Sequence, residues 1–98
     1  MTSSAFLPDI QLYAKAGCHL CEQAEAQLAR LRRRLPHALQ RVDITDDAEL
    51  LGRYGLRIPV LVLDGREYDA PLDWVEIERG LVQAAAAGGG TEAQRHGR

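Results

Sequence analysis

The sequence predicts a single α/β domain whose elements follow the order β-α-β-α-β-β-α and form a four-stranded mixed sheet with helices on both faces. Three observations support this prediction. Short runs of strand-forming residues alternate with helical periodicities, a proline ends the first helix, and an Asp-Gly pair separates the last two strands. The 98 residues suffice for one small domain, and 46% of them are hydrophobic, so an ordinary packed core is expected.

The first half of the predicted domain is a βαβ unit. Residues 10–14 predict a short strand that Gly17 ends. Pro36 stops the following helix, because proline cannot continue the hydrogen-bond ladder, and residues 39–44 alternate in polarity as a second strand does. The apolar residues of the helix recur three or four positions apart, as on one helical face, and are Leu20, Ala24, Leu28, Leu31 and Leu35.

Two further helices are predicted in the second half of the chain. Asp46 and Glu49 resemble a capping box that opens a short helix, and Gly55 suits a left-handed position after its end. Pro71 or Asp73 opens the last helix. The apolar residues available for burial on that last helix are Leu72, Val75, Ile77, Leu81 and Val82.

The remaining two strands are predicted to form a hairpin between these helices. Residues 59–63 are an unbroken apolar run, which fits a strand buried on both faces. Asp64 and Gly65 are a strong signal for a tight turn. The turn leads into a fourth strand at residues 66–68.

Residues 1–8 and 88–98 are expected to be flexible ends, which leaves residues 9–87 as the folded domain. The tail starts with three glycines and has no apolar periodicity. The start of the chain has neither the basic nor the apolar region of a secretion signal, and no apolar stretch is long enough to cross a membrane. We therefore expect a cytoplasmic protein. In a reducing compartment a lone cysteine pair is more often catalytic, redox-sensing or metal-binding than structural.

Other conspicuous side chains are given structural roles. The net charge of −2 and the scarcity of aromatic residues argue against nucleic acid as a partner. Tyr54 and Trp74 are expected to pack in the core or at its edge, Tyr13 is expected to be half-buried on its strand, and His37 is assigned no role. A run of basic residues is interpreted as the solvated end of the first helix and consists of Arg30, Arg32, Arg33 and Arg34.

Cys18 and Cys21 form a CxxC motif where the first strand ends and the first helix begins. The free N–H groups and the helix dipole favour a thiolate at Cys18, which is the species that attacks disulfides. The spacing lets Cys21 reach back over one turn to resolve a mixed disulfide. Lys15 and His19 are candidate cations that stabilise the thiolate, although a lone lysine or histidine can also be a plain surface residue.

The segments LYAKAGCHLC, RVDIT and GLRIPVLVLDG resemble the glutaredoxin branch of the thioredoxin superfamily, and the resemblance runs from residue 10 to residue 82. It implies a thioredoxin-like fold and a thiol–disulfide oxidoreductase. It also implies that Pro59 follows a cis bond and faces the CxxC motif. Ile58 would then offer its backbone N–H and C=O groups to an extended substrate.

The sequence departs from the glutathione-using members of that branch at two places. His19 and Leu20 stand where those members carry Pro-Tyr, and residues 68–73 lack their glycine pair. Asp69 would repel the γ-glutamyl carboxylate of glutathione if it faced the same groove. Lys15 matches the family's basic residue and supports glutathione, so glutathione stays open as a co-substrate.

Three functions follow from these features. The first is a monomeric redox enzyme without a tightly bound cofactor or metal, in which Cys18 and Cys21 exchange disulfides. Its partners would be a protein or low-molecular-weight disulfide and, as reductant, glutathione or a thioredoxin-type reductase. The second is a metal or iron–sulfur module that takes further ligands from a second chain or glutathione, because two cysteines cannot complete a four-thiolate site. The third is a non-catalytic redox-sensing or partner-binding domain.

Overall fold

The computed structural model describes residues 7–87. Residues 1–6 and 88–98, which carry most of the predicted flexible ends, lie outside this range. The element order β-α-β-α-β-β-α confirms the sequence prediction. The elements are β1 (Asp9–Ala14), α1 (His19–Arg34), β2 (Ala38–Asp43), α2 (Ala48–Tyr54), β3 (Val60–Leu63), β4 (Arg66–Asp69) and α3 (Trp74–Ala86).

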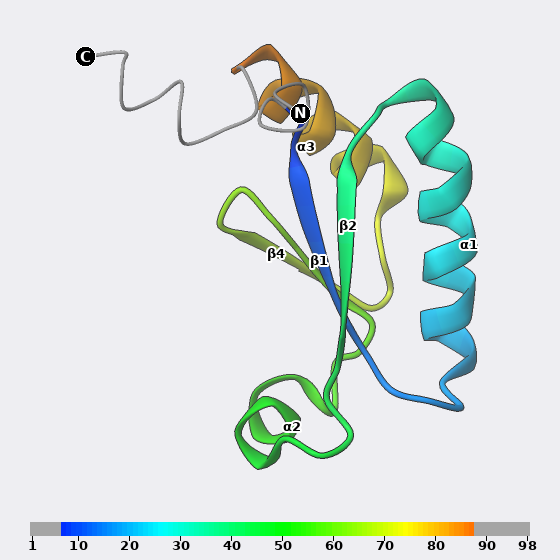
Figure 1. Ribbon diagram of the computed structural model, residues 1–98, viewed down its shortest axis with the longest axis vertical. Coiled ribbons are helices and arrows are strands. Elements are labelled where there is room, and N and C mark those ends of the chain that lie inside the picture. The colour runs from blue at the N-terminus through cyan, green and yellow to red at the C-terminus, as the bar shows by residue number, and fades with distance from the viewer. Residues whose placement is uncertain (1–6, 88–98) are drawn as a thin grey trace.

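The four strands form a mixed sheet in the order β2-β1-β3-β4 (Figure 1). β1 and β2 are parallel, as expected for two strands that are joined through a helix, and the other neighbours are antiparallel. Tyr13, near the end of β1, pairs with Val60 at the start of β3. The carboxyl end of β1 therefore lies beside the beginning of β3.

The two faces of the sheet carry different helices, as predicted. α1 and α3 cover one face, and their buried residues form the main core with alternate residues of β1 and β3. α2 lies apart from them at one end of the sheet (Figure 1). Its Tyr54 is buried with Val60 in a smaller cluster. Tyr13 packs against this cluster from the side of β1 that faces away from the main core. The β1 residues that face the main core are Ile10, Leu12 and Ala14.

α1 begins after Cys18, its N-cap, and ends before Pro36 as predicted. Leu35 closes the last turn by donating its N–H to the carbonyl oxygen of Leu31 at 2.8 Å. The sequence predicts Leu20 on the buried face, but Leu20 is 55% exposed. It lies in the first turn of the helix, where no element of residues 7–87 buries it. The buried residues of α1 are Cys21, Ala24, Leu28 and Leu31.

The two ends of α2 differ from the prediction. Asp47, not Asp46, is the N-cap, and its side chain accepts a hydrogen bond from the N–H of Leu50 at 3.0 Å. Gly55 has a right-handed backbone, with φ −55°, rather than the left-handed one expected. A Cβ at Gly55 would lie 2.5 Å from the carbonyl oxygen of Leu51, so the position needs glycine for space.

The hairpin turn is as predicted, and β4 runs one residue further, to Asp69. Asp64 and Gly65 both have positive φ angles, 53° and 81°, which is the backbone of a two-residue turn that matches the twist of the strands. Glycine and aspartate tolerate this conformation better than most residues do.

The sequence predicts that Pro71 or Asp73 opens α3, and the structure shows that Asp73 does. Asp73 is the N-cap, and its Oδ1 accepts from the N–H groups of Val75 and Glu76 at 3.1 and 3.3 Å. The expected burial of Val75 and Val82 is wrong, because they are 66% and 52% exposed. They lie seven residues apart on the side of the helix that faces away from the sheet, whereas the buried positions are Ile77, Leu81 and Ala84.

Candidate active site

Cys18 and Cys21 lie where the chain leaves β1 and enters α1. Gly17 has a φ of +79°, a left-handed backbone that glycine adopts without strain, and it turns the chain into the helix. The N–H of Cys18 donates to the carbonyl oxygen of Lys15 at 3.4 Å and closes this turn. The loop therefore places the first cysteine directly at the N-terminus of a 16-residue helix.

The two cysteines form a disulfide across the first turn of α1. Their Cα atoms are 5.2 Å apart, within the range that a disulfide requires. Cys21 is 1% exposed and belongs to the main core, whereas Cys18 is half-buried and reaches the surface. The N–H of Cys21 donates to the Sγ atom of Cys18 at 3.1 Å. An incoming sulfur atom can therefore approach Cys18 but not Cys21.

The two candidate cations lie on either side of Cys18 in the sequence but differ in their surroundings. The His19 side chain is 91% exposed, and its Nδ1 atom lies 3.5 Å from a carboxylate oxygen of Glu22. Lys15 is half-buried in the loop after β1. His19 is thus directed to a carboxylate on its own helix.

Ile58 and Pro59 lie at the same end of the sheet as the cysteines. Val60, the next residue, pairs with Tyr13, and Tyr13 stands five residues before Cys18. The Ile58–Pro59 bond is cis, which confirms what the family resemblance implies. Pro59 is buried, and Ile58 is half-buried and packs against both clusters of the core.

A groove that the sequence did not predict begins beside these residues and follows α1. We call it the α1 groove, and its volume is about 440 Å³. One wall is α1, and the other is the segment that leads from β4 into α3, drawn in yellow in Figure 1. Pro59 lines the groove between the two walls. The other lining residues are Leu20, Gln23, Ala24, Ala26, Gln27, Arg30, Ala70, Pro71, Leu72 and Trp74.

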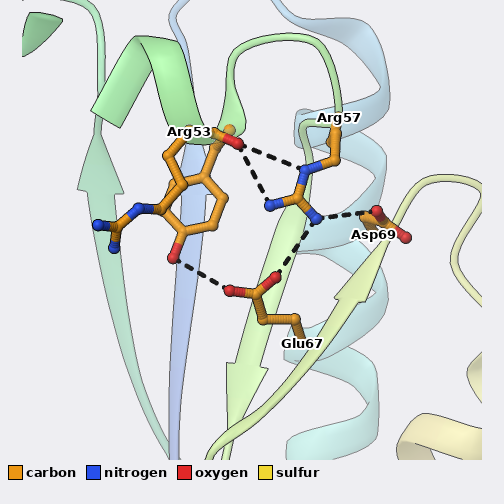
Figure 2. Close-up of polar contacts among 5 residues, drawn as sticks. Arg53, Arg57, Glu67 and Asp69 are labelled. Carbon is orange, nitrogen blue, oxygen red and sulfur yellow. Dashed lines mark hydrogen bonds and ion pairs between the residues drawn. The ribbon is translucent and has the colours of Figure 1, made fainter. Parts of the chain in front are cut away.

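Asp69 does not line the α1 groove, so the expected repulsion of a bound carboxylate loses its geometric basis. Successive residues of a strand point to opposite faces of the sheet. Tyr68 packs against the main core, and Asp69 therefore projects from the other face. There its Oδ2 atom accepts a hydrogen bond from Nη1 of Arg57 at 3.0 Å (Figure 2).

Arg57, the residue before Ile58, is joined to β4 and the residue after it by several contacts. Its Nη1 atom also donates to Glu67 at 3.3 Å, and its carbonyl oxygen accepts from the N–H of Ala70 at 3.3 Å. The hydrogen bond to Asp69 is the main reason that the pKa of Arg57 is raised. Figure 2 shows the guanidinium between the two carboxylates. The segment that carries Ile58 is thus fixed to the strand that leads into the groove wall.

Two tyrosines stack beneath this arginine. The rings of Tyr13 and Tyr54 are 4.3 Å apart, and the Arg57 guanidinium carbon lies 5.3 Å from the centre of the Tyr54 ring. Burial raises the pKa of the Tyr13 hydroxyl above its ordinary value. Both side chains pack as the sequence predicts, and they support the loop before Ile58.

The fold and the cysteine pair define a thioredoxin-superfamily protein of the glutaredoxin-like kind. The family model "Glutaredoxin-like domain (DUF836)" matches residues 9–85, and the chain belongs to this family.

The chain is also similar to individual proteins and solved structures. Protein Rv0508 of Mycobacterium tuberculosis is 35% identical over 66 residues, which are 62% of this chain and 68% of that protein. The crystal structure of XcR50 from X. campestris is similar with a TM-score of 0.66 and 43% identity, over 76% of this chain and 97% of that one. Oxidised thioredoxin O2 from Arabidopsis thaliana shares the fold, with a TM-score of 0.60 and 22% identity over 83% of this chain and 80% of that one.

Proposed function

We propose that this protein is a thiol–disulfide oxidoreductase in which Cys18 attacks substrate disulfides and Cys21 resolves the intermediate. One observation carries the proposal. An accessible Cys18 stands at a helix N-terminus, at disulfide distance from a buried Cys21. Cysteines in such positions have lowered pKa values, because the free N–H groups and the helix dipole stabilise the thiolate.

The reaction has two exchange steps. The Cys18 thiolate attacks one sulfur of the substrate disulfide, forms a mixed disulfide and releases the first substrate thiolate, which takes a proton from water. Cys21 then loses its proton and attacks the Sγ atom of Cys18. The Cys18–Cys21 disulfide forms, and the second substrate thiol leaves. Two electrons pass to the substrate, and an external dithiol or two monothiols must return them.

The surrounding residues are assigned supporting roles in these steps. The N–H of Cys21 already donates to the Cys18 sulfur and would donate more strongly to a thiolate. Lys15 adds a positive charge near the thiolate. His19 adds one when it is protonated, although Glu22 competes for it. We assign to the backbone of Ile58 the role of pairing with an extended substrate chain, which is supported by its position between Arg57, bonded to Asp69, and Val60, paired with Tyr13.

The partners that suit this site are disulfides of proteins or small molecules. We propose a monomer that works in the cytoplasm and is reduced by glutathione or by a thioredoxin-type reductase. Asp69 lies on the opposite face of the sheet, which removes one argument against glutathione. Among residues 7–87, no helix is long and apolar enough to cross a membrane.

Two variants test the proposal. We expect Cys18→Ser to reduce turnover of a neutral disulfide, such as bis(2-hydroxyethyl) disulfide, to background. Cys21→Ser should instead accumulate a mixed disulfide on Cys18, which mass spectrometry detects as one added thiol per chain. Wild-type turnover in the Cys18→Ser protein would overturn the proposal, and so would an adduct on Cys21 of the Cys18→Ser protein that forms as fast as the one on Cys18.

A redox titration provides an independent test. The proposal expects a reversible two-electron transition between about −270 and −180 mV, the range of known exchange catalysts. A disulfide that stays closed below about −300 mV is characteristic of a structural bridge and would contradict a catalytic role.

A further inference from the structure

The α1 groove combines an apolar lining with one cation and no carboxylate. Leu20, Leu72 and Trp74 supply most of its large apolar side chains. Gln23 and Gln27 supply amides, and Arg30 is the one charged residue of the lining. Among residues 7–87, the contact recorded for the Arg30 guanidinium is a hydrogen bond to Gln27 Oε1 at 2.7 Å, so no carboxylate neutralises it.

The groove extends well beyond the cysteines. Leu20 stands between Cys18 and Cys21, and Arg30 lies ten residues further along α1. Ten residues of helix span about 15 Å. An extended peptide covers that distance with about four or five residues, whereas a tripeptide such as glutathione reaches only about 10 Å. A ligand that uses the whole groove must therefore be longer than glutathione.

We propose that the α1 groove binds the extended chain next to the target disulfide of a protein substrate, and that Arg30 selects an acidic residue about four positions from the attacked cysteine. Between these two points the substrate presents an apolar side chain to Leu72 and Trp74. The inference rests on the proposed function for the identity of the attacked bond. The binding itself requires no redox step.

Three features favour this occupant. Leu20 is 55% exposed beside Cys18, so an apolar residue of the substrate can cover it. The lining contains Arg30 and no acidic residue, so within the groove an acidic side chain of the substrate meets a charge of opposite sign. Pro59 belongs to the lining, which makes the groove continuous with the segment where we expect the substrate backbone to pair.

Trp74 provides a direct readout. It is the single tryptophan of the chain and lies in the groove, so its fluorescence reports occupancy without any disulfide exchange. The probe is a peptide that carries serine at the target position, leucine two residues away and glutamate four residues away. A matched peptide carries glutamine in place of glutamate. Each peptide is made in two versions, with the leucine and glutamate either before or after the serine. All are titrated into the oxidised full-length protein.

For one of the two residue orders, we expect the glutamate peptide to bind about threefold to fivefold more tightly than the glutamine peptide. This difference is typical of an exposed ion pair. Arg30→Gln should abolish this preference. Arg33→Gln, an exposed arginine of the same helix outside the groove, should leave it unchanged. Raising the salt concentration should weaken the preference in the wild type.

The failure of this inference can be separated from the failure of the proposed function. Equal affinity for the two peptides, no change of Trp74 fluorescence with either peptide, or an unaltered preference in Arg30→Gln would overturn the inference. In any of these cases, turnover of bis(2-hydroxyethyl) disulfide by the same protein would still support the oxidoreductase. Glutamate preference in a protein without such turnover would support the groove and contradict the enzyme.

Discussion

Arg57 forms an ion pair with Asp69 on the face of the sheet opposite α1 and α3, with 3.0 Å between Nη1 and Oδ2. The pair joins two segments that flank the candidate site, the loop before Ile58 and the end of β4. It also places the Asp69 charge on the far side of the sheet from the α1 groove. The Asp69 carboxylate, which was expected from the sequence to repel glutathione, is therefore paired with Arg57 and points away from the groove.

Neutralising Asp69 should not improve the use of glutathione. If Asp69 faced the groove, Asp69→Asn would remove a repulsion and raise the rate of reduction by glutathione. Because Asp69 faces Arg57 instead, we expect the rate to stay the same or to fall slightly as the loop before Ile58 loosens. The rate is measured with glutathione and a neutral disulfide, and Asp64→Asn in the hairpin turn serves as the exposed control. A clear rise in Asp69→Asn alone would contradict the structure.

Much of the fold could be predicted because its signals are local. Gly17 and Pro36 mark the ends of β1 and α1, and Asp64 with Gly65 marks the hairpin turn. Each acts through its own backbone or that of its neighbours. These signals also placed Cys18 at a helix start.

The features that the sequence did not predict depend on contacts between distant segments. Whether Asp69 faces the groove depends on the register of β4 and on Arg57, which lies 12 residues earlier. The α1 groove exists because the segment before α3 lies beside α1 without covering it. Val75 and Val82 are apolar yet exposed, and among the described residues no element packs over them. Periodicity finds an apolar face but not the element that covers it.

The cap of α2 distinguishes two neighbouring aspartates. Asp47→Ala removes the acceptor for the N–H of Leu50, so we expect it to lower the free energy of unfolding by about 1 kcal/mol. Asp46→Ala is the matched control and should change it by less than about 0.5 kcal/mol. Urea denaturation followed by circular dichroism measures both. A larger loss of unfolding free energy in Asp46→Ala than in Asp47→Ala would show that Asp46 is the N-cap, as expected from the sequence.

Two helical glycines should respond to alanine with opposite signs. A Cβ at Gly52 meets nothing within 4 Å, so Gly52→Ala should stabilise the protein by about 0.5–1 kcal/mol through its helix propensity. A Cβ at Gly80 would lie 2.7 Å from the Tyr68 hydroxyl oxygen and 3.1 Å from Leu63 Cδ2, so Gly80→Ala should destabilise it by about 1–3 kcal/mol. Thermal unfolding compares the two variants.

The double variant Gly80→Ala with Tyr68→Phe identifies the clash. The Tyr68 hydroxyl is buried without a hydrogen-bond partner among the described residues, so Tyr68→Phe alone should cost little. In the double variant we expect part of the stability lost in Gly80→Ala to return. Simple additivity of the two effects would show that the hydroxyl is not the obstacle.

His37 should make the stability of the fold depend on pH. It is 2% exposed in the turn between α1 and β2, and its Nδ1 atom lies 2.8 Å from the carbonyl oxygen of Leu35. Its Nε2 atom is buried without a partner among residues 7–87. Burial lowers the pKa of His37 below its usual 6.5, because a charged imidazole is poorly solvated there.

The sign of the pH effect follows from proton binding. Below about pH 6.5 the unfolded chain binds a proton at His37 that the folded chain does not, so the free energy of unfolding falls as the pH decreases. The slope cannot exceed about 1.4 kcal/mol per pH unit for one group, and it vanishes below the folded pKa. Urea denaturation between pH 7.5 and about 5 measures this slope. His37→Leu should remove it, whereas His19→Gln, which changes an exposed histidine, should retain it. An equal slope in His37→Leu and the wild type would contradict the lowered pKa, because it would show that His37 binds protons equally in the folded and unfolded states.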